Sequence, residues 1–314
     1  RAQQCLEMMR AAGLVPGSFA FTAAISACSK TGDWESAVSL LGEMRRENIL
    51  PNVVTFTAAM HACGKGGQWQ TALDLMDDMR AQGVPPNAFS YRTAIAICAR
   101  AGKWEKTLQL IEQMKKEGLT PDLIDYGAAM GACGKGNQPG LALKLLADMQ
   151  KAGVPPSNTS YRQALSACGY SGKWEQALEL LDDMQERGLS PNSFLYASAI
   201  SSCAKSGMWK KALGLLDRMH KVGVPPDVFA YSAAISACER GGQWEKALEL
   251  LRVMPSRNVT PNVVCYNAAI AACEKGYRWE KAMELLEEMP TVGVAADVIT
   301  YNTCIAACAT GKQW

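Results

Sequence analysis

Apolar residues recur along this chain with the spacing of amphipathic helices, and the pattern returns every 35 residues. In the segment 263–297, Tyr266, Ile270 and Cys273 follow the i, i+4, i+7 spacing of one helical face. A second apolar face runs through residues 279–289, again with the period of a helix. Each 35-residue segment is therefore predicted to form two α-helices joined by a short turn.

Turn residues separate these predicted helices at fixed places. With Val53 as position 1 of a repeat, position 31 is Gly or Asn throughout, and position 34 is Pro in all but the last case, Ala296. Gly and Asn tolerate the left-handed conformation that ends many helices, and Pro prevents continuation. Gly276 is expected to break the first helix of its repeat, and Pro139 fits the first turn of a second helix.

The repeat runs through the whole chain without insertion or deletion. A length of 314 residues would suggest two globular domains, but an aromatic residue returns at position 4 in all nine registers, from Phe21 to Tyr301. The chain is therefore predicted to be one repeat array in which stacked hairpins share a continuous core. Its expected parts are a partial repeat 1–17, full repeats 18–52, 53–87, 88–122, 123–157, 158–192, 193–227, 228–262 and 263–297, and a partial repeat 298–314.

The net charge of +2 conceals an uneven distribution between the two predicted helices. Positions 1–16 of the repeats, which hold the first helix, carry 13 basic and 4 acidic residues, and the rest carries 19 basic and 26 acidic residues. The first helices thus form a basic layer of net charge +9 and the second helices an acidic layer of net charge −7. A local basic surface of this kind is the electrostatic signature of a nucleic-acid binder.

Cysteine spacing argues against both disulfides and metal sites. Nine of the twelve cysteines occupy position 11, a core position, and Cys5, Cys265 and Cys304 show no partner pattern. Helix axes lie ~8–10 Å apart, too far for a disulfide between equivalent positions, so free buried thiols in a reducing compartment are predicted. No Cys-x-x-Cys pair or catalytic constellation is present, so no metal, cofactor or enzymatic activity is expected. No apolar run reaches the ~18 residues of a membrane helix, so no membrane insertion is expected.

Two segments carry a family resemblance. The sequences VVCYNAAIAACEKGYRWEKAMELLEEMPTVGVAAD (263–297) and NVVTFTAAMHACGKGGQWQTALDLMDDMRAQGVPPN (52–87) resemble the 35-residue P-type pentatricopeptide repeat, and the similarity extends over the chain. The resemblance implies an all-α fold, a right-handed superhelical α-solenoid of helix-turn-helix hairpins with the first helices on its concave side. It also implies single-stranded RNA as the partner, read one nucleotide per repeat, in chloroplasts or mitochondria (stroma or matrix).

The resemblance assigns base reading to positions 5 and 35 of each repeat. Thr22 with Asn52, Thr57 with Asn87 and Ser232 with Asn262 resemble adenine readers, and Asn267 with Asp297 resembles a uracil reader. Asn302 is a position 5 residue without its position 35 partner in the sequence. The other pairs depart from the family pattern: Arg92 with Asp122, Gly127 with Ser157, Arg162 with Asn192, and Ala197 with Asp227. The expected target RNA is 5′-AA, four unread nucleotides, then AU-3′. The resemblance also implies that the RNA runs from 5′ to 3′ along the repeats.

Two further sets of residues complete the expected RNA site. By resemblance, position 2 supplies apolar side chains that sandwich each base: Phe19, Val54, Phe89, Ile124, Phe194, Phe229, Val264 and Ile299. Position 13 supplies one cation per repeat, which matches one phosphate per nucleotide: Lys30, Lys65, Arg100, Lys135, Lys205, Arg240 and Lys275. Tyr170 and Thr310 are the exceptions. Alternatively, these cations complement the dipole at the helix C-terminus.

Two functions from different classes fit these observations. The first is sequence-selective RNA binding in organellar RNA processing, stability or translation. The second is a structural scaffold, in which the solenoid surface binds protein partners in a large organellar assembly such as a ribosome or photosystem. The departures from the family pattern in the middle repeats favour the second, and the basic first-helix layer favours the first.

Overall fold

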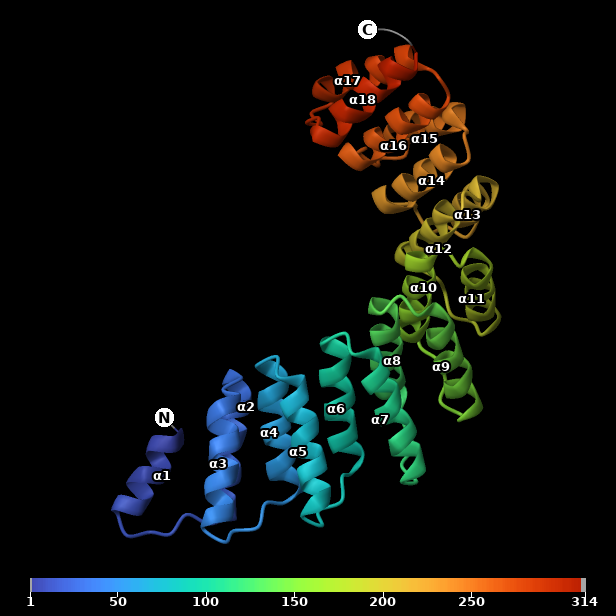
Figure 1. Cartoon of the computed structure of the whole chain (residues 1–314). Helices are drawn as coiled ribbons and strands as arrows, with labels where there is room; N and C mark the ends of the chain where they lie inside the picture. The colour runs from blue at the N-terminus through green and yellow to red at the C-terminus, as the bar shows by residue number, and fades with distance from the viewer. Residues whose placement is uncertain (1, 312–314) are drawn as a thin grey trace. The chain divides into compact units, whose positions relative to one another are not determined.

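The computed structural model describes residues 2–311, with the side chains of residues 2, 3 and 170 excepted. Every regular element in this part of the chain is an α-helix (Figure 1), so the all-α prediction is confirmed. After α1 (Ala2–Ala11) come the first helices α2 (Ser18–Thr31), α4 (Val53–Lys65), α6 (Ala88–Arg100), α8 (Leu123–Lys135), α10 (Asn158–Ser171), α12 (Ser193–Lys205), α14 (Val228–Arg240), α16 (Val263–Lys275) and α18 (Val298–Thr310). They alternate with the second helices α3 (Trp34–Arg46), α5 (Trp69–Ala81), α7 (Trp104–Lys116), α9 (Pro139–Lys151), α11 (Trp174–Glu186), α13 (Trp209–Lys221), α15 (Trp244–Ser256) and α17 (Trp279–Thr291).

The helix ends follow the predicted turn chemistry. Position 31 has a positive φ in each repeat, including 55° at Asn48 and 58° at Asn258. The first helix α16 ends at Lys275, but Gly276 has a φ of −83°, and the left-handed residue is Tyr277 with a φ of 56°. The prediction that Gly276 ends this helix is therefore confirmed, and the left-handed conformation of the turn falls one residue later, at position 15.

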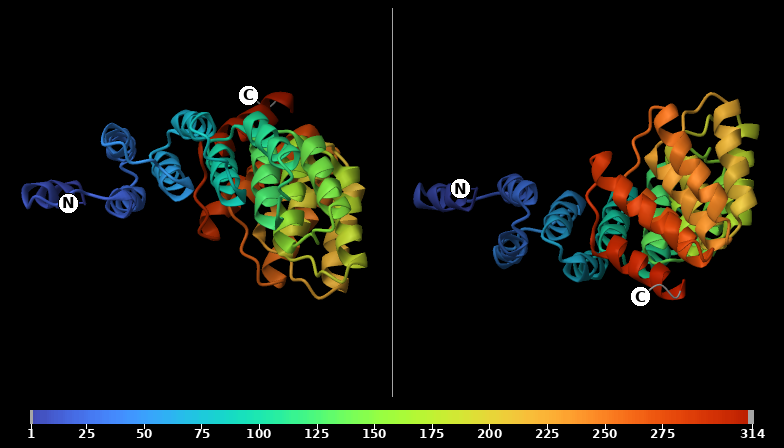
Figure 2. Two further views of the ribbon diagram at one scale, coloured as in Figure 1. Left: turned by 90° about the horizontal axis from the view of Figure 1, so that it is seen from below. Right: turned by 90° about the horizontal axis from the view of Figure 1, so that it is seen from above.

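The helices form two compact units, residues 1–136 with 141–156, and residues 137–140 with 157–314. Within each unit a first helix packs against the first helix of the next repeat, as α2 does against α4 and α12 does against α14 (Figures 1 and 2). A second helix packs on the first helix of its own repeat and on that of the following repeat, as α3 does on α2 and α4; the same holds for α5, α7, α11, α13, α15 and α17. Every hairpin therefore buries its apolar faces only by stacking on a neighbour.

The core consists of the residues that define the period. The position 4 aromatics from Phe21 to Tyr266 are at most 2% exposed, and the position 27 methionines from Met44 to Met289 are fully buried. Position 11 cysteines such as Cys63 and Cys133 are also buried, and desolvation raises the pKa of each of these two thiols to about 11. The prediction that these series are packing residues is confirmed for the full repeats 18–297, whereas Tyr301 of the last partial repeat is 54% exposed.

Successive repeats also interlock through a tryptophan and a glycine. Trp34 at the start of α3 lies against Gly66 of the next repeat, where a Cβ atom would stand 2.5 Å from the indole ring. The same contact joins Trp244 to Gly276 at 2.5 Å. The glycine at position 14 is thus required by the close approach of a ring rather than by a positive φ.

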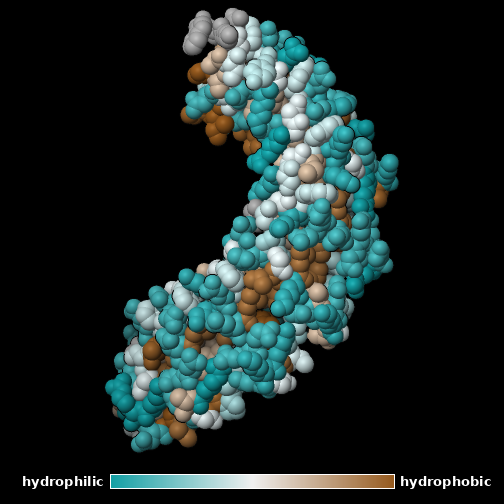
Figure 3. Space-filling model, turned by 45° about the vertical axis from the view of Figure 1, so that its right-hand side comes forward, coloured by the Kyte–Doolittle hydropathy of each residue, from teal (hydrophilic) through white to brown (hydrophobic). Residues whose placement is uncertain are grey.

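Outside the core, the surface is largely hydrophilic, with apolar patches between the polar regions (Figure 3). Among residues 2–311, no helix is long and apolar enough to cross a membrane.

Candidate nucleic-acid interface

The position 2 residues form an exposed apolar row at the start of the first helices. All eight predicted base-sandwiching side chains are exposed, from 51% for Phe194 to 88% for Phe19. Each stands two residues after the N-cap of its helix, where the side chain points out of the core that Tyr196, Phe21 and their equivalents fill. Exposed phenylalanines at a regular spacing are unusual for a solvated face and suit stacking on a flat ligand.

The position 35 residues are the N-caps of the next first helices, a role that the base-reading interpretation did not include. A side-chain oxygen accepts a hydrogen bond from a backbone N–H in every full repeat, from Asn52 with the Thr55 N–H at 3.0 Å to Asp297 with the Thr300 N–H at 2.8 Å. The caps between these two are Asn87, Asp122, Ser157, Asn192, Asp227 and Asn262. An Asn cap leaves its amide N–H₂ free as a donor, and an Asp cap leaves an acceptor oxygen.

In two repeats the side chains at positions 5 and 35 are directly hydrogen-bonded to each other. Asn267 donates from Nδ2 to Asp297 Oδ1 at 3.1 Å, and the Arg92 guanidinium is hydrogen-bonded to the Asp122 carboxylate. Hydrogen bonds to the Thr300 N–H, the Asn267 amide and the Thr300 hydroxyl lower the pKa of Asp297, so this carboxylate is ionised near neutral pH.

In two further repeats a hydroxyl at position 3 of the next repeat bridges the pair. Thr22 Oγ1 lies 2.9 Å from Thr55 Oγ1, which donates to Asn52 Oδ1 at 3.0 Å. Thr57 Oγ1 lies 3.1 Å from Ser90 Oγ, which donates to Asn87 Oδ1 at 3.1 Å. Sequence reasoning missed these bridges, although the Thr or Ser three residues after a capping Asn could have indicated them.

Two of the position 5 residues, to which the resemblance assigns base reading, are buried. Thr57 is 3% exposed and Ala197 is 9% exposed, because the first helix of the next repeat covers them. Thr22, Ser232 and Asn267 are half-buried, and Arg162 and Asn302 are exposed. Gly127 and Ser157 lie in different units. Where Thr57 is covered, the exposed polar group of the pair is the Asn87 amide.

Arg92 also approaches a second, fully buried carboxylate. Its Nε lies 3.6 Å from Asp125 Oδ1, and Asp125 completes a capping box with Asp122. Burial raises the pKa of Asp125. The pKa of Asp122 is lowered, in part because Asp122 accepts hydrogen bonds from the backbone N–H groups of Asp125 and Ile124. Arg92 therefore pairs with both carboxylates, which gives a physical reason for the departure of this pair from the family pattern.

The position 13 cations are exposed, and most of them reach the C-terminus of the preceding first helix. Lys65 Nζ donates to the Lys30 carbonyl at 3.1 Å, Arg240 to the Lys205 carbonyl at 3.1 Å, and Lys135 to the Arg100 carbonyl at 3.3 Å. Lys275 instead pairs with Glu239 at 2.6 Å. The cations thus donate hydrogen bonds to carbonyls at the C-terminus of the neighbouring helix. The Tyr170 side chain, which interrupts the series, lies outside the described residues.

A cavity of about 560 Å³ brings the three predicted sets together on the first-helix face of the second unit. Its wall includes Phe194 and Phe229 from position 2, Ala197 and Ser232 from position 5, and Lys205 and Arg240 from position 13. Position 9 contributes Ser166, Ser201 and Ser236, whose small side chains leave the space open. Two phenylalanines, two cations and several hydroxyls suit a planar base with its phosphate.

The fold and this surface define a helical-repeat solenoid with exposed aromatic side chains and a basic first-helix layer. A family model described as the pentacotripeptide-repeat region of PRORP matches residues 58–222, and the model of the PPR repeat family matches residues 16–65, 226–275 and 261–310. The chain belongs to the pentatricopeptide repeat family. A comparison with curated proteins found no match.

Several solved structures are similar to this chain. The PPR domain of Arabidopsis thaliana protein-only RNase P 1, in complex with tRNA, has 18% identity and a TM-score of 0.51, with 57% of this chain and 94% of that chain covered. Maize PPR10 with an 18-nucleotide psaJ RNA element has 24% identity and a TM-score of 0.46, with 100% and 55% covered. The chain therefore spans about half the length of the maize protein that it matches.

Proposed function

We propose that this protein binds single-stranded RNA along its first helices, one nucleotide per repeat. The cavity between Phe194 and Phe229 is the observation that carries the proposal, because it places stacking rings, hydroxyls and two cations around one base-sized space. Family membership supports the same ligand, and a domain of similar fold, that of Arabidopsis protein-only RNase P 1, was solved in complex with tRNA.

Binding is tested with the predicted RNA. An oligonucleotide with AA, four variable nucleotides and AU is titrated against a scrambled one at several salt concentrations, with fluorescence anisotropy as the readout. We expect tighter binding of the first RNA and a steep fall in affinity with salt. Absence of binding to either RNA at low salt contradicts the proposal.

The cavity is tested with the double variant Phe194→Ala and Phe229→Ala. Loss of both stacking faces is expected to weaken RNA binding by tenfold or more, since base stacking on an aromatic residue contributes ~1–3 kcal/mol. The matched control is Val222→Ala, an exposed apolar residue at the C-cap of the second helix α13. Equal affinities of the double variant and the control would remove the cavity from the interface.

Lys65→Ala separates the two roles of the position 13 cations. If Lys65 contacts phosphate, the variant weakens binding of all sequences alike and reduces the salt slope by about 1. If it acts only on the Lys30 carbonyl, the variant lowers the unfolding midpoint slightly and leaves RNA affinity unchanged. Parallel titration and urea unfolding of the same sample distinguish these results.

We also propose that the protein acts in an organelle, in RNA processing, stability or translation, as the family resemblance implies. Free buried thiols such as Cys133 and Cys168 suit a reducing compartment such as the stroma or the matrix. Imaging of the protein fused to a fluorescent protein at its C-terminus, in plant cells, tests the location, and a nuclear or cytosolic signal contradicts it.

A further inference from the structure

Four side chains of the first unit cover an aromatic ring of the following repeat. Arg10, Arg45, Arg80 and Lys115 occupy position 28, near the end of a second helix, and lie 5.6–5.9 Å from the ring centroids of Phe21, Phe56, Tyr91 and Tyr126. The arginines also pair with a carboxylate of that following repeat: Arg10 with Glu43 at 3.2 Å and Arg45 with Asp78 at 2.5 Å. A cation between a ring and a carboxylate is therefore a recurring feature of the first unit.

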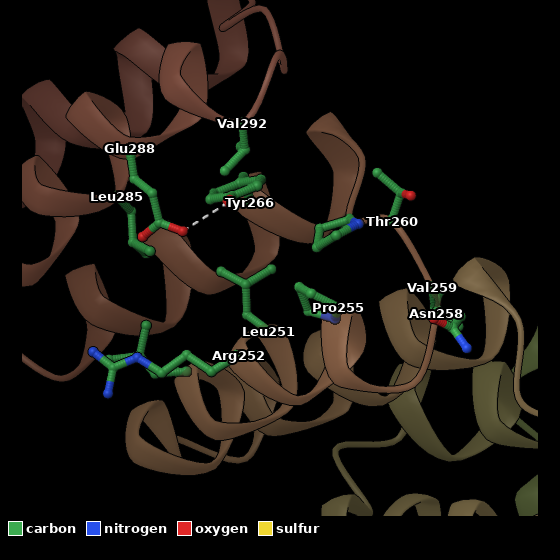
Figure 4. A pocket seen from close by; sticks show the side chains of 12 residues that line it. Leu251, Arg252, Pro255, Asn258, Val259, Thr260, Tyr266, Leu285, Glu288 and Val292 are labelled. Carbon is green, nitrogen blue, oxygen red and sulfur yellow. Dashed lines mark hydrogen bonds between the residues drawn. The ribbon is translucent and has the colours of Figure 1, made fainter.

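The repeat 228–262 lacks this cation. Its position 28 residue is Pro255, near the end of α15, and the ring of the following repeat is Tyr266 on α16. A cavity of about 640 Å³ lies there, and we name it the Tyr266 pocket (Figure 4). Its lining includes Leu251, Pro255, Tyr266, Leu285, Glu288 and Val292.

Both partners of the missing cation are present in the Tyr266 pocket. Glu288 occupies the same repeat position as Glu43 and Asp78, and its Oε1 accepts a hydrogen bond from Tyr266 Oη at 3.0 Å. Figure 4 shows the phenol ring and this carboxylate next to each other above Leu251. Burial, together with Glu288, raises the pKa of Tyr266, so its hydroxyl stays protonated and the carboxylate carries the only negative charge of the pair.

The chain's own cations near the pocket do not replace the missing one. Arg252 lines the pocket and Arg257 follows α15, but among the described residues neither lies within 4.0 Å of the Glu288 carboxylate. Both arginines are exposed.

We propose that the Tyr266 pocket binds the side chain of an arginine from a protein partner. A guanidinium would lie over the Tyr266 ring and pair with Glu288, as Arg45 does within the chain over Phe56 and beside Asp78. Leu251, Leu285 and Val292 provide apolar walls for the aliphatic stem of the arginine. Arginine is favoured over lysine because a planar guanidinium stacks on a ring and bonds a carboxylate through two N–H groups.

Charge favours a basic protein segment over RNA at this site. The pocket lies between the second helices α15 and α17, in the layer of net charge −7, and the carboxylate of Glu288 would repel a phosphate. The Tyr266 pocket is also lined by residues other than those of the cavity between Phe194 and Phe229, so the protein could hold RNA and a protein partner at separate surfaces.

The test uses the peptide acetyl-Gly-Ala-Arg-Ala-Gly-amide, with the tyrosine ring signals of the protein followed by NMR and the Tyr266 signal assigned by Tyr266→Phe. We expect saturable shifts of the Tyr266 signal and at least fivefold weaker binding of the same peptide with citrulline, which keeps the shape and removes the charge. Glu288→Gln should also weaken binding at least fivefold. Glu287→Gln, which removes an exposed neighbouring charge outside the pocket, should leave binding unchanged.

Pro255→Arg provides an independent test, because it restores the cation within the chain. We expect this variant to lose peptide binding and to unfold at a higher temperature than the parent protein. Equal binding of the arginine and citrulline peptides, or full binding by Pro255→Arg, would overturn the proposal. Tighter binding of a leucine peptide, of spermidine or of an RNA oligonucleotide at the Tyr266 signal would also overturn it, in favour of an apolar partner, a small polyamine or RNA.

Discussion

At the scale of single residues, position 35 serves both the fold and the proposed recognition of RNA. The oxygen of Asn87 caps α6, which fixes the side chain and leaves its N–H₂ group at the surface. A capped side chain has already lost its rotamer freedom, so it can contact a base at a lower entropic cost. The capping requirement also explains why Asn, Asp and Ser are the residues found there.

Two substitutions of Asn87 separate capping from reading. Asn87→Asp keeps the cap but replaces the exposed donor with an acceptor, so stability should change little while preference shifts from adenine, which offers N1 as an acceptor, towards guanine, which offers N1–H as a donor. Asn87→Ala should lower stability by ~1 kcal/mol. Urea unfolding and RNA titration of both variants check this, and an unchanged base preference in Asn87→Asp refutes the reading role.

Tyr277 is a residue in an unfavourable backbone conformation. Its φ of 56° lies where most repeats have glycine, as at Gly242 with a φ of 67°, and its side chain is 73% exposed. We expect Tyr277→Gly to raise the free energy of unfolding by ~1 kcal/mol, since a non-glycine residue in this region costs ~1–2 kcal/mol. Tyr277→Phe is the control and should be neutral. A stabilising effect of the same size in the control would point to the phenol group instead of the backbone.

At the scale of elements, close packing of the first helices depends on small residues at matched positions. Ile97 on α6 stands where most repeats have Ala, and it packs on Gly64 of α4. A Cβ atom at Gly64 would lie 2.4 Å from Ile97 Cγ1, so the large residue of one repeat is accommodated by the missing side chain of its neighbour.

Gly64→Ala is therefore expected to destabilise the first unit by ~1–3 kcal/mol through overpacking against Ile97. The double variant Gly64→Ala with Ile97→Ala should recover much of this loss, because the two side chains no longer compete for the same volume. Gly42→Ala serves as the matched control, since this helical glycine has no atom within 4 Å of a built Cβ, and it should stabilise by ~0.5–1 kcal/mol. Thermal unfolding of the four proteins measures these effects, and an absence of coupling in the double variant would contradict the contact.

At the scale of the whole molecule, position 11 buries one thiol in each full repeat, Cys265 and Cys304 are also buried, and Cys5 is exposed. Desolvation raises the pKa of Cys63, Cys98 and Cys133 to about 11, and the reactive thiolate is therefore scarce at pH 8.

A thiol-reactive dye at pH 8 should consequently label the native protein in one fast phase, at Cys5, with the half-buried Cys308 slower. In 6 M guanidinium chloride all twelve cysteines should react. The variant Cys5→Ser should lose the fast phase. Rapid labelling of Cys133 in the native protein, detected by peptide mapping, would show that the stack opens far more readily than its packing implies.

The sequence determined the local structure and the order of the repeats. The helix period and the turns at position 31 were predictable, because they depend on residues within one 35-residue unit. Contacts between neighbouring repeats could be seen only in the stacked structure. They are the bridge from Thr22 through Thr55 to Asn52, the burial of Thr57 and the contact of Ile97 with Gly64. The Tyr266 pocket beside Pro255 also depends on contacts between neighbouring repeats. In the sequence Pro255 is only a missing cation, but the structure sets it against the buried Tyr266 ring and the Glu288 carboxylate of the next hairpin, and this ring and this charge define a site.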